Sequence, residues 1–152
     1  MDIQTSNPYK AVIFLTNRVG RLLTQAIWQK VDHDEVEIQP QHMGVLSDLW
    51  EKDGIRQQDL AVSNIKDKAT IARTISLLEK KNILVRIEDS KDKRTKRIYL
   101  THKGKSLKQH LIPHARATVE EAMENISEEE LNICNTVLSK IYTNLNGCTR
   151  ND

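Results

Sequence analysis

Apolar residues recur at helical spacing in the first part of the chain. Between Val12 and Ile27 they fall every three or four positions, and Asn7 followed by Pro8 fits an N-cap and a first helical residue. The spacing therefore predicts a first helix over about residues 8–30.

The middle of the chain predicts a helix-turn-helix. A helix with its apolar residues on one face ends near Lys52, and two short helical patterns follow over residues 57–63 and 68–81. Asp67 can cap the second of this pair, and Asn82 tolerates the left-handed conformation that often ends a helix. Two helices separated by only a few residues are typical of the helix-turn-helix motif.

The residues that follow this pair alternate between apolar and polar side chains, as β-strands do. The runs "ILVRIE" and "RIYLT" flank the polar segment "DSKDKRTK", and together they predict a hairpin with a long polar loop. Between Arg86 and Lys105 there are eight basic residues against three acidic ones. This hairpin should therefore carry a strong positive charge.

Two long helices are predicted in the last third of the chain. The first follows Thr101, a possible cap, and should kink near Pro113, which has no N–H to donate. The second opens with a capping box formed by Ser127 and Glu130 and should end at Gly147.

Composition supports a mainly helical fold. The 152 residues include only 5 Gly, 3 Pro and 4% aromatic residues, which argues against barrels and sandwiches. The fold class we expect is mainly α with a small β-hairpin wing, that is, a winged helix-turn-helix with long terminal helices. The length of the chain fits a single domain, residues 1–152.

Neither membrane insertion nor export is expected. The apolar run from Ala11 to Leu15 is far shorter than the roughly 20 residues of a membrane-spanning helix, and it also falls short of a signal-peptide core. Cys134 and Cys148 form no C-x-x-C pair. A cytoplasmic location is the expectation that follows.

A helix-turn-helix followed at once by a basic hairpin can bind double-stranded DNA. The second helix would enter the major groove, and the hairpin loop would follow the backbone into a minor groove. The alternatives are an ordinary amphipathic helix with a solvated face and a merely solvated charged loop. The candidate DNA-binding residues are Arg56, Gln57, Lys68, Ala69, Thr70, Ala72, Arg73, Lys91, Asp92, Lys93, Arg94 and Lys96.

A known order of motifs runs through the same segment. It consists of Leu60 and Ala61, then "LLEKKNILVR", then "DKR" in the wing, then "LTHKG". In this order the sequence resembles the MarR (multiple antibiotic resistance regulator) family of winged-helix transcription factors, with Asn82 where the family usually has Gly. The resemblance implies that Arg94 enters the minor groove and that Asp92 holds it by a charge-assisted hydrogen bond.

The resemblance also implies a homodimer. Residues 8–35 and 102–147 would form the dimerisation helices, and residues 40–101 the DNA-binding lobe. Such a dimer would act on a pseudo-palindromic operator, as a repressor that responds to a small-molecule effector. Side chains that could line an effector pocket are Tyr9, Trp28, His42 and Trp50, although a core role would explain them equally well.

Two other functions remain open at the level of the sequence. The acidic carboxyl-terminal segment, with seven acidic against two basic residues from Ala117 onward, could make the chain a protein-interaction module. His110 and His114 are one helical turn apart, but "LIP" between them supplies no Glu for a hydrolytic zinc site. We therefore expect neither an enzyme nor a bound cofactor, and no metal is assigned to these histidines.

Overall fold

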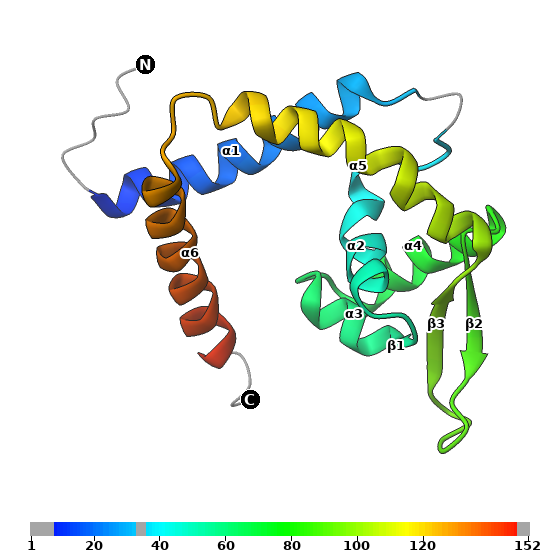
Figure 1. Cartoon of the computed structure of the whole chain (residues 1–152). Coiled ribbons are helices and arrows are strands. Elements are labelled where there is room, and N and C mark those ends of the chain that lie inside the picture. Colours follow the sequence, from blue (N-terminus) through cyan, green and yellow to red (C-terminus); the bar gives the residue numbers. More distant parts are fainter. Residues whose placement is uncertain (1–7, 33–35, 149–152) are drawn as a thin grey trace. The chain divides into compact units, whose positions relative to one another are not determined.

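A computed structural model of the chain describes residues 8–32 and 36–148. The structure divides into two compact units, residues 1–118 and residues 119–152. It is mainly helical with one small sheet, and this confirms the expected fold class (Figure 1). No helix in the described ranges is long and apolar enough to cross a membrane.

The first helix has the bounds that the sequence predicts, whereas its predicted cap, Asn7, lies outside the described residues. Helix α1 spans Pro8–Lys30. Ile27 and Trp28 near its end pack against the core of the first unit. Several apolar residues farther toward the amino terminus are exposed, among them Val12, Ile13, Leu15, Val19 and Leu22.

The helix-turn-helix consists of α3 (Gln57–Ser63) and α4 (Lys68–Lys80). It is preceded by a short 3-10 helix, η1 (Pro40–His42), and by α2 (Met43–Glu51). These bounds agree with the predicted ones to within one residue. α3 is tied to α2 by the Asp48 carboxylate, which accepts hydrogen bonds from the Ser63 hydroxyl and the Asn64 amide, the latter at 2.9 Å.

The sheet contains the predicted hairpin and a third strand that the sequence analysis missed. β2 (Leu84–Glu88) and β3 (Lys96–Leu100) pair antiparallel, and β1 (Ile55–Arg56) adds to the other side of β3 in the order β1-β3-β2. Two residues are too few to show a period of two, so β1 could not be found from the pattern. It places Arg56 opposite Arg97 at the base of the wing.

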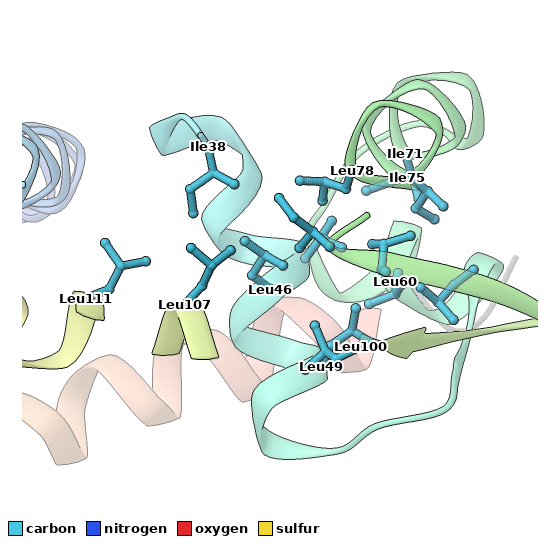
Figure 2. Packing of buried hydrophobic residues seen from close by; sticks show 14 of the residues in the cluster. Ile38, Leu46, Leu49, Leu60, Ile71, Ile75, Leu78, Leu100, Leu107 and Leu111 are labelled. Atoms are coloured by element: carbon cyan, nitrogen blue, oxygen red, sulfur yellow. The ribbon is translucent and has the colours of Figure 1, made fainter. Parts of the chain in front are cut away.

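One apolar core holds these elements together. Figure 2 shows side chains from several elements pointing toward one another, including Leu46, Leu60, Ile75 and Leu100. Each is at most 7% exposed. The core fixes the angle between α4 and the β2–β3 hairpin, because both contribute residues to it.

The last two helices are α5 (His102–Ala122) and α6 (Glu128–Cys148). α5 continues through Pro113, and its expected kink stays a prediction. The capping box of α6 is confirmed, since the Glu130 N–H donates to the Ser127 hydroxyl at 3.2 Å and the Glu130 carboxylate accepts from the Ser127 N–H at 2.8 Å. The predicted end at Gly147 is wrong by one residue, because a glycine weakens a helix without ending it.

Candidate nucleic-acid interface

Helix α4, the second helix of the helix-turn-helix, begins with an N-cap from Asp67. The Asp67 carboxylate accepts from the Thr70 N–H at 2.8 Å and from the Thr70 hydroxyl at 2.7 Å, which confirms the predicted N-cap. These bonds lower the pKa of Asp67, the hydroxyl contributing most. Thr70 is thereby held in one rotamer, and Arg73 donates to its hydroxyl at 3.3 Å.

The same helix turns a polar surface outward. Lys68, Ala69 and Arg73 are exposed, while Thr70 and Ala72 are half-buried between this surface and the core. Small side chains on the first turns allow a DNA groove to approach closely, and the cations attract its phosphates.

The tip of the wing is organised by Asp92. Its carboxylate accepts from the Arg94 backbone N–H at 3.0 Å and from the Thr95 hydroxyl at 3.1 Å. The expected bond from Asp92 is therefore made to the backbone of Arg94. Among the described residues no carboxylate pairs with the Arg94 guanidinium, which is exposed together with Lys91 and Lys93.

The base of the wing contains an ion pair that the sequence analysis did not find. Asp89, only 8% exposed, accepts from the Arg97 Nε–H and from the Lys91 N–H, the latter at 2.8 Å. Arg97 also donates to the Gly54 carbonyl at 2.8 Å. The pKa of Asp89 is lowered first by the Lys91 bond and then by Arg97. These contacts fasten the start of the loop to β3, and β3 to the residue before β1.

Arg86 stabilises the packing of β2 on α4 and adds little to the charged surface. Its guanidinium pairs with Glu79 at 2.6 Å and donates to the Ser76 hydroxyl at 2.8 Å and the Ala72 carbonyl at 3.2 Å. It therefore fixes β2 against α4 and is not free to contact a polyanion. The sequence counted it among the cations of the hairpin because charge counts ignore which face a strand residue occupies.

A concave basic surface joins α3, α4 and the wing. A hollow of about 240 Å³ is lined by Arg56, Gln57, Gln58, Lys68, Arg94, Thr95 and Lys96. Five of these residues were predicted from the sequence, while Gln58 and Thr95 were missed because only the docking of the wing beside α3 brings them there. The other predicted residues, Ala69, Thr70, Ala72, Arg73, Lys91, Asp92 and Lys93, lie on α4 and the wing outside this hollow.

Two cations of this surface are paired with carboxylates. Arg56 makes two hydrogen bonds to Asp59, at 2.7 and 3.1 Å, and Lys96 lies 2.7 Å from Glu88. Lys96 lowers the pKa of Glu88, so this carboxylate stays charged near neutral pH. All four side chains are about half exposed, and such pairs are weak and screened by salt. A phosphate can therefore replace either carboxylate.

A second crevice lies between α1, α2 and α5. It has a volume of about 290 Å³, and Trp28, Trp50, Met43 and Leu111 are among its lining residues. Two of the four predicted pocket residues thus line it, and Trp50 is held there by donating to the Gly104 carbonyl at 2.9 Å.

The other two candidates lie elsewhere. Tyr9 is exposed near the start of α1, and His42 is buried with its Nδ1 accepting from the Gln39 N–H at 3.1 Å. Burial lowers the pKa of His42, and the positive charges of Lys81 and Lys66 lower it further. The imidazole is therefore neutral and forms part of the lobe's structure.

The candidate metal ligands do not form a cluster. His110 places Nδ1 3.0 Å from the Ser106 carbonyl, a contact within its own helix. Within residues 8–32 and 36–148 no group of three or more His, Cys, Asp or Glu side chains is arranged to hold a metal ion.

Comparisons with known proteins agree with this architecture. A model of the MarR family matches residues 38–96. The transcriptional regulator HosA of Escherichia coli O157:H7 is 29% identical over 105 residues, which cover 69% of this chain and 76% of that protein.

Two solved structures have a similar fold. The complex of a MarR family regulator from Listeria monocytogenes with 26mer DNA has a TM-score of 0.79 at 22% identity, covering 89% of each chain. Bordetella bronchiseptica BpsR, described with regulation of its DNA binding by 6-hydroxynicotinic acid, has a TM-score of 0.73 at 20% identity, covering 86% of this chain and 98% of that one.

Proposed function

We propose that the chain is a transcriptional regulator of the MarR family that binds double-stranded DNA sequence-specifically as a ligand-responsive repressor. The observation that carries this proposal is the basic hollow in which α3, α4 and the wing meet. In this proposal the protein is a cytoplasmic homodimer that acts on a pseudo-palindromic operator.

Each half of the operator would be read by two elements. The first turns of α4 would enter the major groove, where Lys68 and Arg73 can reach base edges and phosphates. The wing would insert Arg94 into the adjacent minor groove, where the potential is most negative. The Asp92 bond to the Arg94 backbone supports this role, because it fixes the turn and leaves the guanidinium available.

The terminal helices support the proposed dimer. α1 exposes an apolar stripe, and α6 exposes another one that includes Ile133, Val137, Leu138 and Tyr142. Exposed apolar surfaces of this extent are unfavourable in water and are typical of interfaces. A two-fold dimer would present its recognition helices to half-sites about one helical turn apart.

The crevice beside Trp28 and Trp50 supports effector control. It is mostly apolar, as small-molecule sites usually are, and it is also lined by Pro40 of η1. Gln41 of η1 accepts a hydrogen bond from Lys66 at 3.3 Å, and Lys66 immediately precedes the cap of α4. An effector that displaces η1 would therefore move the start of the recognition helix and shift the population of DNA-competent dimers.

Fluorescence anisotropy with double-stranded DNA tests this function. An operator would first be selected from a random pool, and its affinity then measured at several salt concentrations. Arg94→Ala should weaken binding and reduce the slope of log affinity against log salt by about 1, since one cation fewer displaces counterions from the DNA.

Arg116→Ala is the matched control because it removes an exposed guanidinium from α5, away from the hollow, and should leave the slope unchanged. An affinity that responds neither to salt nor to Arg94→Ala would refute the proposal. Failure to select any preferred sequence would favour the protein-interaction module instead.

A further inference from the structure

Helix α3 ends in a Schellman motif whose left-handed residue is Ile65. The Ile65 N–H donates to the Val62 carbonyl at 3.1 Å, and the Lys66 N–H donates to the Ala61 carbonyl at 3.0 Å. A turn that is closed by both bonds requires a positive φ at the residue that donates the first of them. Ile65 accordingly has φ 52°.

The end of α4 shows what such a position ordinarily contains. The same two bonds run from Asn82 to Glu79 at 2.9 Å and from Ile83 to Leu78 at 3.0 Å, with φ 55° at Asn82. Among the described residues other than glycine, only Ile65, Asn82 and Asn125 have a positive φ. Asn tolerates this conformation, whereas a β-branched side chain is disfavoured there.

Packing does not explain the presence of isoleucine. The side chain of Ile65 is 81% exposed, and that of Val62, one turn before it, is 71% exposed. Both therefore contribute little to the core of the lobe. An unfavourable backbone conformation combined with an exposed apolar side chain suggests that the favourable contact forms only with a partner.

The position of this turn identifies the partner. A second hollow, of about 380 Å³, includes Val62, Ala61 and Lys66 in its lining. It shares Gln58 and Lys68 with the basic hollow that reaches Arg94. Asp59, which pairs with Arg56, and Asp67, which caps α4, also line this second hollow. Val62 thus borders the surface proposed to face DNA, and Ile65 lies next to Lys66 in the chain.

We propose that Val62 and Ile65 contact the C5-methyl group of a thymine in each half-site, while Lys66 and Lys68 bind the flanking phosphates. The thymine methyl is the apolar group that DNA presents in its major groove, and branched side chains can read it. This inference rests on the proposed function and adds a sequence preference to it.

Replacing thymine by deoxyuracil tests the contact, because this change removes only the methyl group. Each thymine of the selected operator would be replaced in turn and the dissociation constant measured by anisotropy. One position per half-site should lose affinity about fourfold with the wild-type protein, which corresponds to burying one methyl group. With Ile65→Asn or Val62→Ala, thymine and deoxyuracil at that position should be bound equally.

Two controls separate this role from a structural one. Arg94→Ala should weaken both operators by the same factor and keep the fourfold ratio. Ile65→Asn should not lower the urea midpoint of unfolding, since Asn occupies the equivalent position at the end of α4. A lower midpoint would make Ile65 a structural residue.

The remaining outcomes also decide between the two proposals. If the wild-type protein binds DNA but binds thymine and deoxyuracil equally at every position, the turn does not read DNA and its apolar surface faces another protein. If binding to DNA shows no salt dependence at all, the proposed function itself fails.

Discussion

Gly104 lies where α5 approaches the winged lobe closely, and Gly104→Ala should therefore destabilise the protein strongly. A Cβ at this position would lie 2.1 Å from the Ile83 carbonyl oxygen and 3.0 Å from Cδ2 of Leu100. The first of these is a backbone atom that also accepts hydrogen bonds from the N–H and the hydroxyl of Thr101, both at 3.0 Å. The clash cannot be relieved by turning a side chain.

The magnitude follows from two contributions. Relief of the contact requires the first turn of α5 to move by roughly 1 Å, and overpacking of this kind costs about 1–3 kcal/mol. The movement would also strain the bond from Trp50 to the Gly104 carbonyl, which contributes about 0.5–1.5 kcal/mol. We expect a total loss of about 2–4 kcal/mol in the free energy of unfolding.

Urea unfolding followed by circular dichroism and tryptophan fluorescence would measure this loss, with all variants at one protein concentration. Gly20→Ala is the matched control, because nothing lies within 4 Å of a Cβ at that position in α1. The same substitution should there raise stability by about 0.5–1 kcal/mol through helix propensity. Equal stability of Gly104→Ala and the wild-type protein would refute the close approach of α5 to the lobe.

Two further predictions concern the lobe. Burial and nearby lysines lower the pKa of His42 in the folded chain. As the pH drops through about 6.5, the unfolded chain therefore takes up a proton that the folded chain does not. The free energy of unfolding should fall over this range and level off below the folded-state pKa of His42. Urea midpoints between about pH 7.5 and 5.5 would show this slope. His42→Gln should reduce it, and a wild-type midpoint independent of pH would contradict it. Asn82→Ala should lower the free energy of unfolding in urea by about 1 kcal/mol, because the φ of 55° at this position disfavours alanine relative to Asn. Asn82→Gly should lower it less. Equal losses in the two variants would argue against the left-handed conformation.

The sequence by itself determined those features whose hydrogen bonds close within a few residues. The cap at Asp67 and the capping box of Ser127 and Glu130 each depend on side chains three positions from the backbone groups that they serve. The left-handed turn at Asn82 is closed by backbone bonds that span three and five positions. Helix and hairpin periods are equally local. These features placed the recognition helix and the wing in the right order along the chain.

Only the tertiary structure decided how the cations of the hairpin are used. Arg97 pairs with Asp89 and donates to the Gly54 carbonyl, 43 positions earlier in the chain. Arg86 donates to the Ala72 carbonyl of α4 and therefore adds little to the charged surface. Those partnerships depend on the register of β2 on β3 and on the addition of β1, which no local pattern specifies. The Asp92 carboxylate differs from these long-range partners, because it accepts from the Arg94 backbone N–H only two positions away. Spacing along the chain still does not decide between this N–H and the Arg94 guanidinium as the donor.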